Sequence, residues 1–110
     1  MEVLFETKRL HKRLGTSRSR QKEFGVEAAK KIAQRLESLA ACSSLADMRQ
    51  LPGRCHELTG DWAGHLAVDL QHPMRLVFRP TRSETTVKPD GGMDWRAVES
   101  VTIVEIIDYH

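Results

Sequence analysis

The chain has few cysteines and no long apolar run, and these absences exclude several classes of protein. Its 110 residues include only two cysteines, Cys42 and Cys55, which are too few for a small domain held together by disulfides. No apolar run approaches the length of a transmembrane helix, and the first residues do not follow the pattern of a secretory signal. We therefore expect reduced thiols, a cytoplasmic location and no membrane contact.

The net charge is also small, at +2, but it is unevenly distributed along the chain. Hydrophobic residues make up 40% and charged residues 29%, which is the composition of a globular protein. A length of 110 residues suffices for one domain, spanning 1–110, around one core. From Lys8 to Lys31, nine basic residues stand against two acidic ones. This concentration could face nucleic acid, and the alternative is an ordinary solvated helix face.

The first half of the sequence has the periodicity of helices, after a short apolar run at residues 1–6 that we interpret as a strand. Residues 7–14 and 17–24 are predicted as short helices, the first capped by Thr7 and ended by Gly15. Residues 26–41 give the clearest helix, and a third short helix is possible at 45–49. In 26–41, apolar residues recur at helical spacing at Ala29, Ile32, Ala33, Leu36, Leu39 and Ala40.

The period changes from 3.6 to 2 after Pro52-Gly53, which indicates strands in the second half. Strands are predicted at 54–58, 65–70 and 74–78, and no helix is expected between residues 54 and 78. A turn at 59–64 and a tight connection at 71–73 join these strands. Residues 81–98 are polar and predicted to form a long hairpin loop.

The strongest strand signal is at Val101–Ile107, where six of seven residues are β-branched. Strict alternation places Val101, Ile103 and Ile107 on one side, with Val104 and Ile106 on the other. A strand that is apolar on both sides belongs inside a sheet rather than at its edge. The predicted fold is therefore α+β, in the order β-α-α-β-β-β-β, with helices packed on one face of a mainly antiparallel sheet.

Polar side chains that could do chemistry occur on or beside these strands. If the helices cover one face of the sheet, such groups can converge on the other. An imidazole can give or take a proton near neutral pH, and a guanidinium can hold a phosphate with two hydrogen bonds. The set therefore suits phosphodiester chemistry, and its members are Arg54, His56, Arg75, Arg79, Asp108, Tyr109 and His110.

Three segments of the sequence carry a resemblance to a known family. They are Leu-Pro-Gly-Arg-Cys-His-Glu-Leu-Thr-Gly-Asp-Trp-Ala-Gly at 51–64, Arg-Leu-Val-Phe at 75–78 and Val-Glu-Ile-Ile-Asp-Tyr-His at 104–110. With them the chain resembles the HigB branch of the RelE/ParE toxin superfamily, toxins of bacterial type II toxin–antitoxin systems that are also called plasmid killer proteins. The terminal Asp-Tyr-His after an apolar strand is the most specific feature. The family's fold is the α+β arrangement predicted above.

The resemblance implies an mRNA interferase, a ribosome-dependent endoribonuclease that inhibits translation by cutting mRNA in the decoding site. Neither a metal nor another cofactor is implied. The RNA 2′-hydroxyl attacks the adjacent phosphate, and the 5′-oxygen leaves. By position the implied catalytic residues are His56, Arg75, Asp108, Tyr109 and His110. We assign His56 as base, Arg75 as phosphate clamp and His110 as acid, and the two histidine roles could be exchanged.

The implied partners are the 70S ribosome with its mRNA and a HigA-like helix-turn-helix antitoxin. We expect contacts with RNA and the ribosome from six basic residues, Lys8, Arg9, Lys12, Arg13, Arg54 and Arg79. The chain departs from many relatives at Thr59, where they carry a lysine before the turn's glycine. That difference removes one positive charge, for which Arg54, His65 or Arg79 could substitute.

Other interpretations stay open at the level of sequence. His56 could be an ordinary hydrogen-bonded strand histidine, and Trp62 and Trp95 could either stack on bases or cover the core. The chain could also be a non-catalytic module of the same fold that binds nucleic acid or a partner, or a gyrase inhibitor of the ParE type. A zinc site from Cys55, His56, His65 and His110 lacks any typical ligand spacing.

Overall fold

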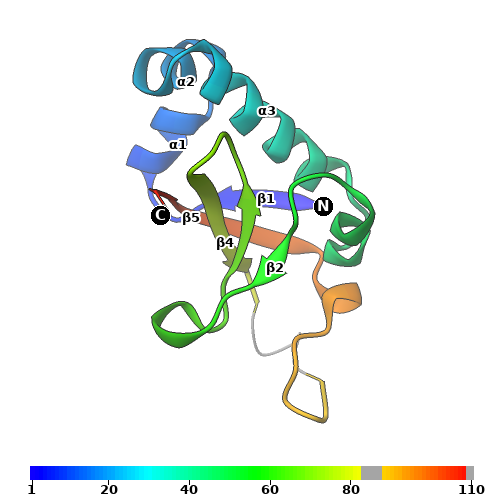
Figure 1. The fold of residues 1–110 in the computed structure, drawn as a ribbon. Coiled ribbons are helices and arrows are strands. Elements are labelled where there is room, and N and C mark those ends of the chain that lie inside the picture. The colour runs from blue at the N-terminus through cyan, green and yellow to red at the C-terminus, as the bar shows by residue number, and fades with distance from the viewer. Residues whose placement is uncertain (83–87, 109–110) are drawn as a thin grey trace.

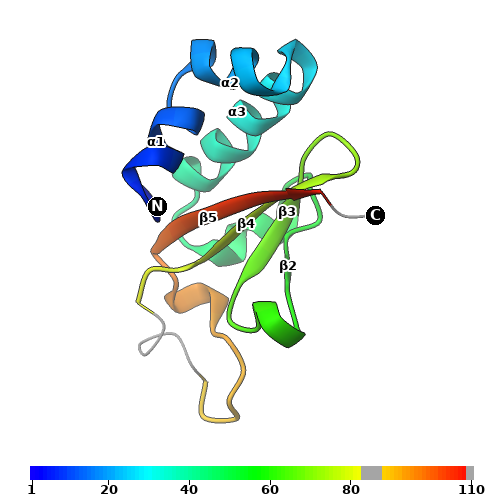
Figure 2. The same ribbon diagram turned by 90° about the vertical axis from the view of Figure 1, so that its left-hand side faces the viewer.

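Three α-helices and a five-stranded sheet make up the described part of the computed structural model, residues 1–82 and 88–108 (Figures 1 and 2). The helices are α1 (Lys8–Leu14), α2 (Ser17–Phe24) and α3 (Val26–Ala41), in agreement with the predicted segments. Thr7 caps α1, because its hydroxyl accepts a hydrogen bond from the backbone N–H of Leu10 at 3.0 Å. Gly25, with φ 84°, allows the sharp bend between α2 and α3.

The sheet contains β1 (Glu2–Phe5), β2 (His56–Glu57), β3 (Leu66–Asp69), β4 (Met74–Pro80) and β5 (Ser100–Asp108), in the spatial order β1-β5-β4-β3-β2. The strand β1 runs parallel to β5, and the other pairs are antiparallel. β5 therefore has a neighbour on each side, which confirms the prediction that this apolar segment is an interior strand. The predicted α+β class is also confirmed.

One hydrophobic core joins the helices to one face of the sheet. Its fully buried members include Leu14 of α1, Ile32 of α3, Leu76 and Phe78 of β4, and Ile103 of β5. Burial of each such side chain contributes about 1.5–3 kcal/mol, before the opposing loss of conformational entropy. The helices lie over this face in Figure 2, which leaves the opposite face of β2, β3 and β4 outside the helical layer.

A β-bulge in β5 corrects the predicted alternation of that strand. Val77 pairs with Glu105 and the next residue, Phe78, pairs with Ile103, so Val104 is an extra residue. The bulge reverses the sides beyond it, and Ile106 rather than Ile107 packs against the core with Ile103. Strict alternation therefore gave the wrong side for Ile106 and Ile107.

Two details of the helical prediction are also corrected. In α3 the predicted apolar stripe included Ala40, which is exposed, whereas Arg35 is buried with only 8% of its surface accessible. The side chain of Arg35 reaches across to the sheet, where its Nε donates to the backbone carbonyl of Asp69 at 2.8 Å. The short helix expected at 45–49 is a 3-10 helix, Leu45–Gln50.

The predicted strand at 54–58 is shorter than expected, because only His56 and Glu57 pair with β3. A 3-10 turn at Gly60–Trp62 occurs within the predicted turn, so the range 54–78 contains one helical turn, against the expectation. The segment after β4 contains another, Trp95–Ala97, within the range 81–98 that was predicted as a long hairpin loop. None of the helices among residues 1–82 and 88–108 is long and apolar enough to cross a membrane.

Candidate active site beside the β3–β4 turn

Strand register brings the polar residues of three strands onto the face opposite the helices. His56 of β2 pairs with Ala67 of β3, Ala67 pairs with Val77 of β4, and Asp69 pairs with Arg75. Directly opposed side chains lie on the same face, so His56, Asp69 and Arg75 share one face. At ordinary strand spacings the Cα atoms of His56 and Arg75 are roughly 12 Å apart. Two side chains with a phosphate between them can span that separation.

Asp69 is the centre of this cluster. Its Oδ2 lies 2.7 Å from Nε of Arg54, and its Oδ1 lies 3.3 Å from Nε of Arg75. The second contact is an ion pair without an aligned hydrogen bond, since no described residue donates one to the buried Oδ1. The carboxylate of Asp69 is therefore shared by two guanidiniums, with an aligned hydrogen bond from Arg54 and an ion pair with Arg75.

The backbone around Arg54 is unusual. Arg54 has φ 51°, in the left-handed region that residues with a side chain rarely adopt, and it follows Gly53 at φ 114°. A Cβ on Gly53 would lie 2.5 Å from Cγ2 of Val68 and 2.9 Å from Nε of Arg35, so only glycine fits. The conformation is fixed by a 2.7 Å hydrogen bond from the N–H of Asp69 to the Gly53 carbonyl. Strain of this kind is often found at functional sites.

His56 is held in one tautomer when it is neutral. Its Nδ1 lies 2.7 Å from the backbone carbonyl of Arg54, and because a carbonyl can only accept, Nδ1 carries the proton and donates. The lone pair of the neutral ring is then on Nε2, the nitrogen away from the backbone. His56 is partly exposed, so Nε2 has the chemical form of a general base on the open face.

The C-terminal end of β5 lies beside the same turn. Asp108 pairs with Met74, the residue before Arg75, and Ile107 pairs with Arg75 itself. Asp108 therefore ends its strand next to the proposed phosphate clamp. Tyr109 and His110, the other two predicted catalytic residues of this segment, lie outside the described residues.

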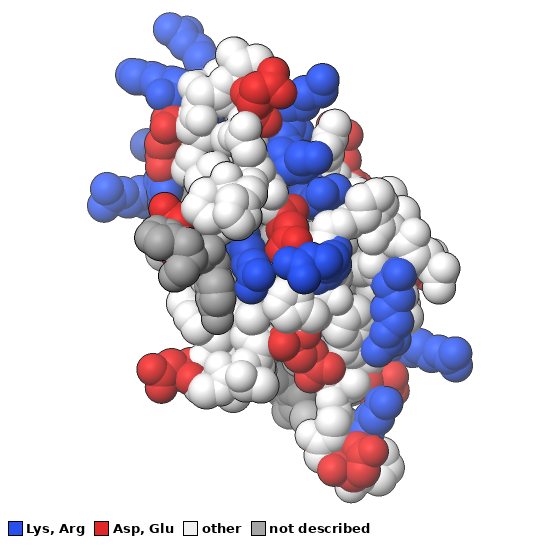
Figure 3. Space-filling view, in the orientation of Figure 1, with Lys and Arg blue, Asp and Glu red and all other residues white. Residues whose placement is uncertain are grey.

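A small pocket of about 150 Å³ lies beside the β3–β4 turn. It is lined by Arg54, Asp69, Leu70, His72, Pro73, Met74 and Arg75. The two guanidiniums and one carboxylate give these three side chains a net charge of +1. Figure 3 shows basic side chains on both sides of acidic ones in the middle of the viewed face. A positive pocket of this size can hold a phosphate group.

No known family model matches the chain, and no curated protein sequence matches it either.

Arg79 and the basic helices lie apart from this pocket. Arg79 is at the far end of β4, where its guanidinium contacts Glu6 at 3.0 Å. The structure therefore does not bring Arg79 to Arg75. Lys8, Arg9 and Lys12 are exposed on α1, and Figure 3 shows basic side chains gathered over the helical part of the molecule.

Arg13 differs from the other basic residues of α1 because it is engaged in ion pairs. It contacts Glu23 of α2 at 2.5 Å and Glu105 of β5 at 3.4 Å. The hydrogen bond from Arg13 holds the pKa of Glu23 below its ordinary value. Arg13 therefore joins α1 to α2 and to the sheet, and Lys8, Arg9 and Lys12 are better placed to bind RNA.

Trp95 covers an edge of the core, which is one of the two roles that the sequence left open for it. Only 5% of its surface is exposed, and its Nε1–H donates to Glu57 at 3.0 Å. The guanidinium of Arg49 lies 4.1 Å from its ring centroid, which closes the other side of the ring. Trp95 is therefore not an exposed surface for base stacking.

Neither cysteine has the environment of a reactive thiol. Burial raises the pKa of Cys55 to about 12, and burial is also the main cause of the raised pKa of Cys42. Both thiols are free. Among residues 1–82 and 88–108, no three His, Cys, Asp or Glu side chains are grouped to hold a metal ion. The alternative zinc site included Cys55, His56 and His65, and these three described residues form no such group.

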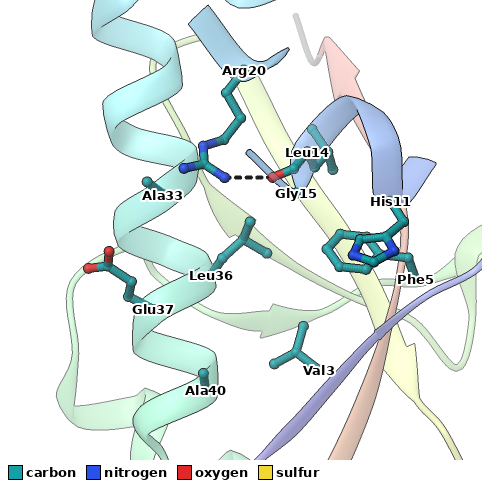
Figure 4. Close-up of a pocket in the computed structure, with 10 residues that line it drawn as sticks. All are labelled: Val3, Phe5, His11, Leu14, Gly15, Arg20, Ala33, Leu36, Glu37 and Ala40. Carbon is teal, nitrogen blue, oxygen red and sulfur yellow. Dashed lines mark hydrogen bonds between the residues drawn. The ribbon is translucent and has the colours of Figure 1, made fainter. Parts of the chain in front are cut away.

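A larger groove, of about 340 Å³, lies between α3, α1 and β1, at the opposite edge of the sheet from β2 (Figure 4). The ring of His11 stacks on Phe5 at 4.8 Å between centroids, and Arg20 donates to the carbonyl of Leu14 at 2.7 Å. Both contacts attach helices to neighbouring elements. The groove lacks the paired guanidiniums of the smaller pocket, so we place the candidate site at the β3–β4 turn.

Two polar residues of the pocket, Asp69 and His72, were not among the predicted site residues. The tight connection at 71–73 could have predicted that Asp69 lies beside Arg75. The two residues are equally distant from position 72 in the sequence, and they pair across the hairpin. His72 was interpreted as a surface residue, and it is exposed at the rim of the pocket.

Proposed function

We propose that this chain is the toxin of a type II toxin–antitoxin system, a HigB-like member of the RelE/ParE superfamily. Its activity would be a ribosome-dependent, metal-independent cleavage of mRNA that inhibits translation in the cytoplasm. The observation that carries the proposal is the pocket with Arg54 and Arg75, which lies beside Asp108 and shares its sheet face with His56.

The reaction requires a base, a cation and an acid around one phosphate. Nε2 of His56, which carries the lone pair of the neutral ring, takes the proton from the 2′-hydroxyl. Arg75, with Arg54 beside it, binds the phosphate oxygens and stabilises the charge that builds on them. His110, two residues beyond Asp108, gives a proton to the 5′-oxygen, and Asp108 and Tyr109 orient it or the RNA.

The partners follow from this activity. A toxin has to be kept inactive until it is needed, so we propose a HigA-like helix-turn-helix antitoxin. The ribosome supplies the mRNA, and the exposed Lys8, Arg9 and Lys12 of α1 contact ribosomal RNA phosphates.

The proposal is tested by expression in bacteria and by cleavage in vitro. Induced wild-type protein should arrest growth, and co-expression with the product of the adjacent gene should give a stable complex and restore growth. His56→Ala should lose cleavage by about 10²–10⁴-fold, because its proton transfer is lost. His65→Ala is the matched control. Like His56, His65 places its Nδ1 beside the backbone carbonyl two residues earlier, which is that of Ala63 at 3.4 Å.

The non-catalytic alternative makes a different prediction for the same experiment. A binding module of this fold would inhibit translation or gyrase without cutting RNA, and its effect would survive His56→Ala. Growth arrest that is unchanged in both histidine variants would support this alternative and refute the proposed nuclease.

A further inference from the structure

Asp69 contacts both arginines of the candidate site, although the sequence alone gave it no role. We propose that Asp69 is a positioning residue that holds Arg54 and Arg75 as a paired clamp for an internal phosphodiester of the RNA. The inference rests on the proposed function and adds a residue that acts through the two arginines rather than on the substrate itself.

The backbone of Asp69 is fixed on both sides, so its carboxylate has a defined position. Its N–H donates to the carbonyl of Gly53 at 2.7 Å, and its carbonyl accepts from Nε of Arg35 at 2.8 Å. Arg35 is itself buried in α3 with 8% of its surface exposed. The side chain of Asp69 is only 26% exposed. The helical layer thus anchors the residue that contacts the two arginines.

Both arginines meet Asp69 through Nε, the nitrogen nearest the aliphatic part of the side chain. The distances are 2.7 Å from Oδ2 to Arg54 and 3.3 Å from Oδ1 to Arg75. The hydrogen bond at Nε of Arg54 fixes the plane of that guanidinium, and the ion pair draws Arg75 toward the same carboxylate. One carboxylate at the wall of the pocket therefore holds both guanidiniums beside each other.

Charge explains why a carboxylate is needed beside a site for an anion. Two guanidiniums in one small pocket repel each other, and Asp69 offsets that repulsion while it leaves a net charge of +1. Removal of Asp69 would therefore have two opposite effects. The pocket would become more positive and bind anions at least as well, but the arginines would separate and lose their orientation.

The test compares Asp69→Asn and Asp69→Ala with matched changes at Asp61, an exposed carboxylate in the turn at Gly60–Trp62. Cleavage of mRNA on programmed ribosomes is measured as kcat and KM, with thermal melting of each variant. Both Asp69 variants should lower kcat by up to about 10²-fold and leave KM unchanged or lower, because misplaced groups slow the reaction. An unchanged kcat, or a loss of kcat/KM that comes only from a raised KM, would overturn the positioning role.

A second measurement needs no cleavage and separates this inference from the proposed function. The Nε–H signals of Arg54 and Arg75 are followed by NMR during titration with a 2′-deoxy dinucleoside monophosphate, which contains a phosphodiester but cannot be cut. In the wild type both signals should be sharp and shift together, whereas Asp69→Asn should broaden them and uncouple their shifts.

The two measurements have separate consequences. If wild-type protein cuts no mRNA but the arginine signals behave as expected, the proposed nuclease is wrong and the clamp stands. If Asp69→Asn leaves both signals and their joint shift unchanged, the clamp is refuted even in a protein that cuts mRNA. The NMR measurement can still be made if Asp69→Ala fails to fold, since Asp69→Asn preserves the shape of the side chain.

Discussion

Replacement of Arg75 by alanine probes the phosphate clamp most directly. Arg75 lies in β4, contacts Asp69 at 3.3 Å and lines the pocket of about 150 Å³ beside the β3–β4 turn. Its guanidinium is proposed to stabilise negative charge that grows on the phosphate oxygens during cleavage. Removal of one such preorganised donor typically lowers kcat by about 10²–10³-fold, equivalent to about 2.7–4 kcal/mol.

The same change should have little effect on stability. Arg54 remains beside Asp69 at 2.7 Å, so the carboxylate keeps one cationic partner. The ion pair that is lost is partly exposed, and such pairs contribute about 1 kcal/mol or less. A large loss of activity with a small change in melting temperature is therefore expected.

Arg79→Ala is the matched control, because Arg79 occupies the same strand and face but contacts Glu6 instead. Cleavage of mRNA on programmed ribosomes is measured for both variants at equal concentrations of folded protein. Arg79→Ala should retain cleavage within a few-fold of the wild type, with any change appearing in ribosome affinity. Equal rates for the two variants, or an Arg75→Ala protein with wild-type kcat, would refute the assignment of the clamp.

Three further predictions concern other parts of the molecule. Charge reversal at the exposed cations of α1, Lys8, Arg9 and Lys12, should weaken ribosome binding and reduce its dependence on salt. Reversal of Lys88 and Arg96, which are exposed outside the basic stretch, should not. Thr59→Lys should raise the cleavage rate if the missing family lysine contributes charge to the site, and Thr81→Lys serves as the control. The thiol of Cys55, with its pKa raised to about 12 by burial, should react with iodoacetamide at pH 8 only after unfolding. The unfolded thiol loses its proton near its ordinary pKa of 9.0, whereas the folded thiol keeps it. The free energy of unfolding should therefore fall as the pH rises above 9.0, and a Cys55→Ala protein should lack this pH dependence.

Local patterns in the sequence were sufficient for most elements of the fold. The helix at Val26–Ala41 and the strand at Ser100–Asp108 were predictable because their signals are contained within one segment. Thr7 could be assigned as a cap for the same reason. The bulge at Val104 could not be foreseen, because it is a property of the pairing with β4 rather than of β5 alone.

The candidate site was predictable only in part. The shared face of His56 and Arg75 follows from alternation along two strands, and the structure has this arrangement. Asp69 was missed because its importance depends on partners 15 residues earlier, at Arg54, and across a hairpin, at Arg75. Arg35 was missed because a basic residue in an amphipathic helix is normally assigned to the solvent side, whereas here it reaches the backbone of β3.

The proposed reaction is cleavage of mRNA on the ribosome by attack of the 2′-hydroxyl. The most direct measurement is to incubate wild-type protein with programmed ribosomes in EDTA, at a concentration that leaves the ribosomes intact, and to determine the chemical ends of the mRNA fragments. His110→Ala is run in parallel. We expect fragments with a 2′,3′-cyclic phosphate and a 5′-hydroxyl, formed by the wild type and about 10²–10⁴-fold more slowly by the variant. Intact mRNA, fragments with a 5′-phosphate, or cleavage that stops on removal of metal would contradict it.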